Sequence, residues 1–480
     1  MKSDSTPYLE AVRRHVQEGV LSFHVPGHQG GLGAAPELSD FLGAKALQAD
    51  ITEVLGIDDL HQPYGQLGEA QRLAAEAFGA QQTHFLVNGS TAGNQAMLLS
   101  CTGHGDLVLV PRNAHRSVWG GLILSGATAA TYLPPFDDKL GVYGVPTVQE
   151  IEAALEAYPN AKAVVVTSPS YHGHACDITA VVRTIQERDC LALVDEAWGA
   201  HLGFHPGFPT SAVHAGADLV VQSTHKMLPS LTQSAMLHVN GERVDRRRLD
   251  SVLRILQTSS PSALLVTSLD AARSHYAEHG EEILETLSRI ASAARNSLNS
   301  IEGIFCRGAE PVTSATVPPD WDPTHLVVSA LGRGYTGYEL EATLRHEHGQ
   351  QVEMSDLFGV VLVLTAGHTE EHLDRFVSAV SSLPQRPPRN SGASRPVFSS
   401  QAFVPRDAFM ASRRQVPSEQ AVGQRAAETI TLYPPGIPWI LPGERIETQV
   451  LSELFSRRDA GGQIQGASDP SLTTLGVYDE

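Results

Sequence analysis

Cysteine is scarce in this sequence. Four cysteines occur among 480 residues, and none of them belongs to a CxxC pair. This spacing excludes a zinc-knuckle pattern and a disulfide framework, and it favours a reducing, cytoplasmic environment. The N-terminal residues lack the apolar segment of a secretory signal, and no stretch approaches the length of a membrane span, so we expect no membrane partner.

Positive charge is also in short supply. The chain has 34 Lys and Arg against 53 Asp and Glu, a formal net charge of −19. Proteins that bind nucleic acid usually have the opposite sign, so nucleic acid is not an expected partner, whereas a cationic substrate suits the acidity weakly. Only 18% of the residues are charged and 42% are hydrophobic, which excludes extensive disorder. The length predicts two or three domains.

Patterns that would hold a catalytic metal are missing despite the 21 histidines. A proline and a glycine stand between His24 and His28, so this pair cannot lie on an HExxH-type helix. His201 and His205 have no carboxylate in their pattern. We therefore expect no metal site. The absence of a G-x-S-x-G turn argues against a serine hydrolase.

Short apolar runs alternate with helical stretches over much of the chain. The expected strands are 83–87, 106–110, 163–168, 191–195 and 218–223, followed by 325–330 and 359–365. The expected helices are 66–79, 147–157 and 178–188, with a helix-rich stretch over 262–299. Strands that are apolar on both faces and alternate with helices predict an α/β fold with a mostly parallel central sheet and helices on both faces. The last two strands predict a smaller α/β domain.

The expected organisation has four parts: an arm over 1–50, a large domain over 51–270, the smaller domain over 271–383, and a linker with a C-terminal subdomain over 384–480. The arm is rich in Gly, Pro and His and reads as irregular. A linker rich in Pro, Arg and Ser covers 383–397. We expect the prolines of 433–444 to forbid regular structure, and the last fifteen or so residues to be frayed.

Asp195 and Lys226 each follow a predicted strand, in VDEAWGAH and VVQSTHKML. Ligands of open α/β sheets bind outside the carboxyl ends of the strands, so both residues are expected at one edge. Pyridoxal phosphate (PLP) needs a lysine amine to hold its aldehyde as an imine and a carboxylate facing its pyridine nitrogen. Asp195 and Lys226 supply that pair. Alone, each residue reads as a helix-capping Asp or a surface Lys.

Two groups of side chains in the sequence suit the binding of a phosphate. Ser223, Thr224 and His225 directly precede the lysine, and Ser90 and Thr91 lie between a strand and a helix in FLVNGSTAGNQAM. Small residues and a helix N-terminus let backbone N–H groups approach a phosphate. An ordinary strand-to-helix turn with a Ser or Thr cap explains the second motif equally well.

His115 follows another strand, in LVPRNAHRSV, and the loop TSPSYHGHACDI (167–178) ends a further one. An imidazole ring can stack on the pyridine of PLP, and the polar groups of 167–178 can line the same edge. Taken without its neighbours, His115 reads as a helix cap. The 167–178 motif has low specificity.

Together these motifs resemble the ornithine/lysine/arginine decarboxylase family of fold-type I PLP enzymes, over nearly the whole chain. The family's blocks are matched in the family's order by FHVPGHQGG, DITEVLGIDDLHQPYG, FLVNGSTAGNQAM, RNAHRSV, SPSYHG, VDEAWGAHLGFH, STHKMLPSLTQSAML and YPPGIPWILPGE. The larger bacterial members begin with a receiver-like wing domain. Here the arm starts almost at once, so we expect the shorter form of the family.

The resemblance implies a role for each matching position. Lys226 would form the Schiff base, Asp195 would pair with the pyridine nitrogen, and His115 and Ala197 would cover opposite faces of the ring. The phosphate would be surrounded by Ser90, Thr91, Ser223 and His225, and His201 would belong to the site wall. Family members are dimers or larger with shared active sites. We therefore expect a homodimer or homotetramer, with the arm around 24–31 and the stretch Ile57–His61 reaching the partner.

The implied reaction is α-decarboxylation of a basic amino acid, with release of CO2 and an amine of polyamine metabolism. The short form favours arginine, giving agmatine, over lysine or ornithine. Asp58, Asp59 and Glu444 are candidates for binding the basic group of the substrate. Two alternatives remain. One is another fold-type I enzyme, such as an aminotransferase or a lyase, because Asp195 and Lys226 are shared among these enzymes. The other is a PLP-binding homologue without catalysis.

Overall fold

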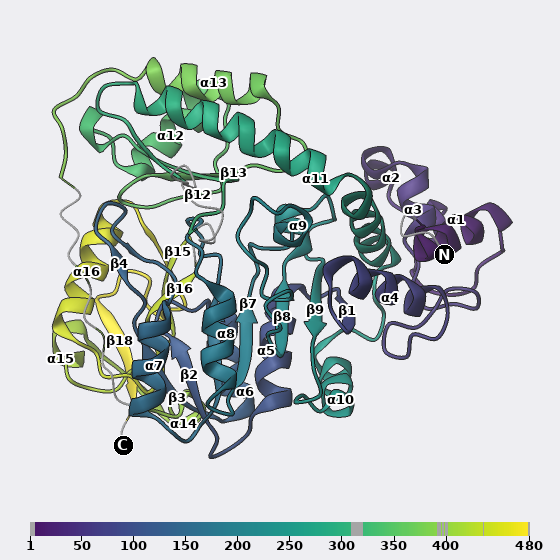
Figure 1. Ribbon diagram of the computed structural model, residues 1–480, viewed down its shortest axis with the longest axis horizontal. Coiled ribbons are helices and arrows are strands. Elements are labelled where there is room, and N and C mark those ends of the chain that lie inside the picture. Colours follow the sequence, from purple (N-terminus) through teal and green to yellow (C-terminus); the bar gives the residue numbers. More distant parts are fainter. Residues whose placement is uncertain are drawn as a thin grey trace.

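The computed structural model describes residues 5–308, 320–390, 395, 398, 402–434 and 436–478. A seven-stranded sheet occupies the centre of the molecule, a four-stranded sheet with its helices lies at one end of it, and the C-terminal segment packs beside the central sheet (Figure 1). We call these two sheets the large sheet and the small sheet.

The large sheet has the strand order β1-β9-β8-β7-β6-β2-β3. Its strands are β1 (Gln82–Leu86), β2 (Leu107–Pro111), β3 (Thr128–Tyr132), β6 (Ala161–Thr167), β7 (Leu191–Asp195), β8 (Leu219–Gln222) and β9 (Ala235–Val239). The run from β3 to β8 is parallel, while β9 is antiparallel to both of its neighbours. The predicted, mostly parallel sheet is therefore confirmed; β3 and β9 were not predicted.

Helices cover both faces of the large sheet because the buried strands are apolar on both sides. One face packs against α5 (Gly89–Cys101), α6 (Arg116–Ser125) and α10 (Arg246–Leu256). The other packs against α7 (Val148–Ala157) and α8 (Ile178–Gln186). This arrangement leaves the carboxyl ends of the parallel strands, and the loops after them, free to form a site.

The small sheet is antiparallel, with the order β10-β11-β13-β12. Its strands are β10 (Phe305–Arg307), β11 (His325–Ser329), β12 (Met354–Ser355) and β13 (Val360–Val363), and its helices are α12 (Gly337–His348) and α13 (Glu370–Ser381). The predicted smaller α/β unit is thus present. The long helix α11 (Ala263–Asn299) packs on β10 and α13 and also on the N-terminal helices, so it joins the two parts.

The expectation of an irregular N-terminal arm is wrong in part. The first fifty residues contain α1 (Pro7–Glu18), α2 (Pro36–Leu42) and α3 (Ala44–Ala49), and α4 (Gln66–Phe78) follows. In α1, Tyr8, Ala11 and Val12 recur at helical spacing and are buried against α11, which the Gly and Pro content of the region obscured. Between α1 and α2 the chain is irregular apart from a short 3-10 turn at Gln29–Gly31.

Two expectations for the C-terminal segment are wrong, namely that 433–444 has no regular structure and that the last residues are frayed. The segment contains α14 (Pro405–Met410), β14 (Arg413–Pro417), α15 (Ser418–Ala421), β15 (Ile430–Tyr433), β16 (Ile437–Ile440), α16 (Thr448–Asp459), β17 (Gln463–Gln465) and β18 (Thr474–Tyr478). Pro438 is tolerated because β16 is an edge strand, where a missing N–H is harmless. The supposedly frayed end forms β18, which pairs with β14. Much of the predicted linker lies outside the described residues.

All four cysteines are buried and free. Among the described residues, no helix is long and apolar enough to cross a membrane. No cluster of three or more His, Cys, Asp or Glu side chains within the described ranges could hold a metal ion.

Candidate active site

Asp195 and Lys226 lie at the same edge of the large sheet, as predicted. Asp195 ends β7, and Lys226 lies in the short helix α9 (Thr224–Met227), which follows the neighbouring parallel strand β8. Burial raises the pKa of Asp195 and lowers that of Lys226, and the attraction between the two charges opposes both shifts. A carboxylate and an amine that can lose its proton therefore lie within electrostatic reach of one another, away from bulk water.

Hydrogen bonds hold the Asp195 carboxylate in a fixed orientation. Asn94 donates through Nδ2 to Oδ2 of Asp195 at 2.8 Å, and the backbone N–H of Ala197 donates to Oδ1 at 3.2 Å. The same Asn94 amide donates to Oγ of Ser117 at 2.9 Å, and that hydroxyl lies 2.8 Å from Nδ1 of His115. A continuous chain of hydrogen bonds thus links His115 to Asp195 through α5 and α6.

His115 caps the N-terminus of α6. The backbone N–H of Ser117 donates to Nδ1, so that nitrogen is unprotonated and the neutral ring has its proton on Nε2. Burial lowers the pKa of His115 to about 3, helped by the nearby charges of Lys226 and Arg116. The ring also lies against Gly436, where a Cβ atom would come within 3.2 Å of it. His115 is therefore a neutral, immobilised ring close to Lys226.

The candidate phosphate-binding residues meet at the start of α5. Ser223 donates through Oγ to Oγ of Ser90 at 2.7 Å, which joins the turn after β8 to the first turn of α5. Gly89, the first residue of α5, has a φ of 72°, a conformation that favours glycine. Thr91 lies in the same first turn with its side chain exposed. Two hydroxyls and a helix N-terminus suit a phosphate group.

One ring nitrogen of His225 is already used in a hydrogen bond to the backbone. Its Nδ1 lies 2.7 Å from the carbonyl oxygen of Ser234 and donates to it, so the neutral ring offers Nε2 as an acceptor. Burial lowers the pKa of His225. It can donate to a phosphate oxygen only when it takes up a proton.

Ala197 and His201 lie on the loop after β7. Ala197 is buried next to Asp195 and donates its N–H to it. His201 is also buried, and its Nε2 lies 3.1 Å from Oδ2 of Asp322, which lies just before β11 of the small sheet. The structure therefore places His201 at the junction of the two sheets.

Sequence reasoning did not assign a role to several residues of this site. Trp198 lies beneath Lys226, whose Nζ is 3.9 Å from the centre of the indole ring. Asn94 and Ser117 orient Asp195 and His115. Trp198, Asn94 and Ser117 all belong to motifs quoted above. Their polar or aromatic side chains within those motifs could have identified them as site residues. Glu353, by contrast, lies just before β12 and had no such signal. Its charge interacts with that of Lys226 and opposes the lowering of the lysine's pKa by burial.

Two of the three candidate substrate carboxylates are occupied by structural contacts. Asp58 is buried and accepts the backbone N–H groups of Gly65, Leu67 and Gly68 at the start of α4. Glu444 forms a buried ion pair with Arg112 at 2.8 Å. Asp59 accepts from the backbone N–H of His61. Asp58 and Glu444 therefore have no oxygen to spare for a substrate.

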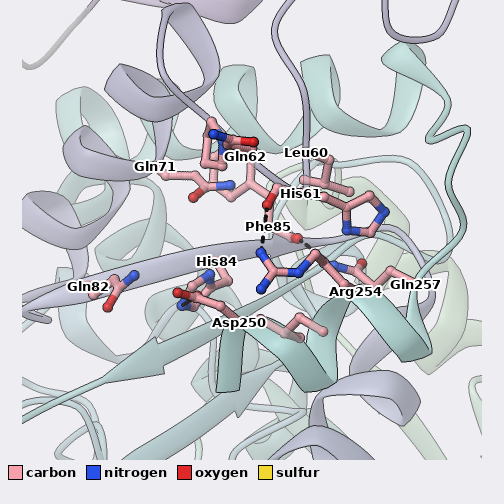
Figure 2. A pocket seen from close by; sticks show the side chains of 12 residues that line it. Leu60, His61, Gln62, Gln71, Gln82, His84, Phe85, Asp250, Arg254 and Gln257 are labelled. Carbon is pink, nitrogen blue, oxygen red and sulfur yellow. Dashed lines mark hydrogen bonds and ion pairs between the residues drawn. The ribbon is translucent and has the colours of Figure 1, made fainter. Parts of the chain in front are cut away.

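A separate polar pocket of about 300 Å³ lies between α4, β1 and α10 (Figure 2). It is lined by Gln71, His84, Asp250 and Arg254 among others, and contains none of the residues predicted to bind PLP. Arg254 points toward the backbone of His61, as the dashed line in Figure 2 shows. The pocket is thus distinct from the edge that carries Lys226.

The residues at this edge fit PLP. They offer a buried amine, a buried carboxylate with two fixed donors, a neutral ring and a pair of serine hydroxyls at a helix N-terminus. These groups match the four parts of PLP in turn: the amine suits its aldehyde, the carboxylate its pyridinium nitrogen, the neutral ring its aromatic face, and the hydroxyls its phosphate. Lys226, Asp195, His115, Ser90 and Ser223 would hold the cofactor.

Comparison with known proteins agrees with this chemistry. A model of the Orn/Lys/Arg decarboxylase major domain matches residues 6–372, and a model of the family's C-terminal domain matches residues 394–461. The arginine decarboxylase of Halalkalibacterium halodurans is 39% identical over 485 residues, which cover 100% of this chain and 99% of that protein. The arginine decarboxylase of Bacillus subtilis is 37% identical over 486 residues, with the same coverage.

A solved structure shows the same fold. The lysine decarboxylase of Francisella novicida superposes with a TM-score of 0.84 at 19% sequence identity, covering 98% of this chain and 81% of that one. The fold and the site define a PLP-dependent enzyme of fold type I. The chain belongs to the Orn/Lys/Arg decarboxylase family, and its reaction is the decarboxylation of a basic amino acid.

Proposed function

We propose that the preferred substrate is arginine, which the enzyme converts to agmatine and CO2. The full-length relatives at 39% and 37% identity are both named arginine decarboxylases and support this choice. The observation that carries the PLP chemistry is the juxtaposition of Asp195 and Lys226 at the ends of two adjacent parallel strands, and the family supplies the decarboxylation.

In this proposal the residues at the sheet edge bind and orient the cofactor. When bound, PLP accepts the electron pair that departing CO2 leaves behind. Asp195, held by Asn94 and Ala197, keeps a proton on the pyridine nitrogen, and Lys226 binds the aldehyde. The neutral His115 ring covers the pyridine without adding a positive charge, and Ser90 and Ser223 anchor the phosphate. Burial of these groups excludes water, which favours loss of the charged carboxylate.

We propose Glu353 as the residue that recognises the guanidinium of arginine. Its charge interacts with that of Lys226, and the residue is exposed, so the carboxylate is within electrostatic reach of the amine and open to an entering substrate. A carboxylate binds a planar guanidinium through two parallel hydrogen bonds, an arrangement that an ammonium group cannot match. Asp58 and Glu444 cannot serve because their oxygens are taken.

The assembly we propose is a homodimer or homotetramer in the cytoplasm. Several large apolar side chains of the N-terminal region are strongly exposed, namely Phe23, Leu32, Phe41, Leu55 and Tyr64. Such a concentration of exposed apolar surface is typical of a protein interface. A second copy of this chain is the expected partner.

The decisive test is an assay of purified protein with PLP against arginine, lysine and ornithine, detecting CO2 and the amine product. Agmatine formation with the highest kcat/KM is the expected result. Keto-acid formation without CO2 would indicate an aminotransferase, and PLP binding without turnover of any of the three would indicate a homologue without this activity.

A further inference from the structure

Asp322 is a buried carboxylate where the small sheet meets the large one. Its Oδ2 atom lies 3.1 Å from Nε2 of His201 and 3.0 Å from Nδ1 of His325. All three side chains are at most 1% exposed. Burial alone would raise the pKa of Asp322, but the two imidazoles hold that pKa well below its usual range. The carboxylate is therefore charged and lies between two imidazole rings, each within ion-pair distance of Oδ2.

Local contacts fix the direction of this carboxylate. Oδ1 accepts from the backbone N–H of Thr324 at 2.9 Å and from its hydroxyl at 2.7 Å. The backbone N–H of Asp322 donates to the carbonyl of Gly173 at 2.8 Å, which ties the segment to the loop after β6. With Oδ1 occupied and the backbone held, Oδ2 has little freedom to turn away from the histidines.

Both histidines are connected to the loop after β7: His201 belongs to it, and His325 packs against it. His201 is at the end of the segment 195–201. The ring of His325 packs edge-on against Trp198, with centroids 5.7 Å apart and planes at 81°. Trp198 in turn lies under the amine of Lys226. One carboxylate thus contacts the segment directly at His201 and indirectly, through His325, at Trp198.

This segment depends on outside support. It carries Asp195, Ala197 and Trp198. Its first half is anchored, since the Glu196 N–H donates to the carbonyl of Val221 at 3.0 Å, but the backbone bonds within the segment are short-range turns, such as Gly199 N–H to the carbonyl of Glu196 at 2.9 Å. A loop held by few internal bonds takes its geometry from the groups packed against it. A shift of 1 Å at a group that positions a reacting centre costs roughly 100-fold in rate.

We propose that Asp322 is a positioning residue of the active site: it clamps the segment 195–201 through His201 and His325 and so sets the position of Trp198 and Asp195 relative to Lys226. The small sheet then contributes to the chemistry without touching the cofactor. This inference rests on the roles proposed above for Asp195 and Lys226.

The test compares Asp322→Asn with Asp137→Asn. Asp137 is a matched control, since its Oδ2 also binds a partly buried histidine, His174, at 3.0 Å, and lies 3.8 Å from Arg307 of the small sheet, but it contacts no residue of 195–201. Each apoprotein is titrated with PLP to obtain its Kd, each loaded enzyme is assayed for kcat and KM, and unfolding midpoints are measured.

For Asp322→Asn we expect PLP affinity to fall about tenfold and kcat to fall about 10- to 100-fold, with KM changed far less. Asp137→Asn should lower the unfolding midpoint while leaving PLP affinity and kcat within about twofold of the parent. If Asp322→Asn does not fold, His201→Asn replaces it, with the same expectation in the same direction.

Two results would overturn the inference: an Asp322→Asn protein that binds PLP and turns over like the parent, or equal losses of both quantities in Asp137→Asn. A failure of the proposed function can be distinguished from a failure of this inference. If borohydride does not link PLP to Lys226 in the parent enzyme, the site itself is misassigned, whereas linkage with an unaffected Asp322→Asn variant rejects only the clamp.

Discussion

The two sheets contribute to the site in different ways. The large sheet supplies groups that would touch the cofactor, namely Asp195, Lys226, His115 and Ser223, all on loops at the carboxyl ends of its strands or at helix starts beside them. The small sheet supplies two carboxylates that act at a distance in our proposals, Asp322 beside the loop after β7 and Glu353 within electrostatic reach of Lys226. In these proposals the first set supplies the chemistry, and the second sets its geometry and its substrate.

Replacing Lys226 should have the largest effect. Lys226→Ala removes the amine that binds the cofactor aldehyde, so we expect kcat to fall by at least about 10⁴-fold. Borohydride treatment followed by mass spectrometry should find PLP attached to Lys226 in the parent and not in the variant. Lys162→Ala, which removes a surface amine paired with Asp106, should leave kcat unchanged. Full activity of Lys226→Ala would place the chemistry elsewhere in the molecule.

Asp195→Asn should come next. The amide keeps the shape of the side chain and can still accept from Asn94, but it cannot hold a proton on the pyridine nitrogen. We expect kcat to fall about 10²- to 10³-fold, the range for losing one preorganised electrostatic group. The PLP absorbance linked to Lys226 should persist. A KM effect without a kcat effect would contradict the division between the two sheets.

Glu353→Gln tests the other side of that division. If Glu353 pairs with the guanidinium, its loss should raise KM for arginine about 10- to 100-fold with kcat nearly unchanged, because a charged hydrogen bond contributes about 1.5–3 kcal/mol. Glu347→Gln, an exposed carboxylate of α12, is the matched control and should change neither constant. An unchanged KM in Glu353→Gln would show that another group binds the substrate's side chain.

The large-sheet half of the site was predictable from sequence, and the small-sheet half was not. Asp195 and Lys226 each end a short apolar run, so strand periodicity alone places them at one edge. Asp322 and Glu353 stand in loops 127 and 158 residues beyond Asp195, and only the folding of the small sheet brings them near. The C-terminal strands were missed because proline reads as a strand breaker, whereas an edge strand such as β16 tolerates it.

The smallest expected effect concerns acid stability. The pKa of His115, about 3 in the folded protein, lies below its unfolded value near 6.5, so the neutral ring contributes stability that is present above pH 6.5 and is lost as the pH falls toward 3. Between pH 7 and 5 this loss amounts to about 2 kcal/mol for one such histidine. In the His115→Gln apoprotein this pH-dependent loss of unfolding free energy should be absent, as measured by urea denaturation at each pH.

The same measurement separates the two sheets. The folded pKa of Asp322 is lowered, so its contribution is lost only as the pH falls below about 4, the unfolded value of an aspartate. Asp322→Asn should therefore lower stability equally at pH 7 and pH 5 and leave the slope between them unchanged. A slope that flattens in Asp322→Asn rather than in His115→Gln would contradict the assignment of the proton uptake in this range to His115.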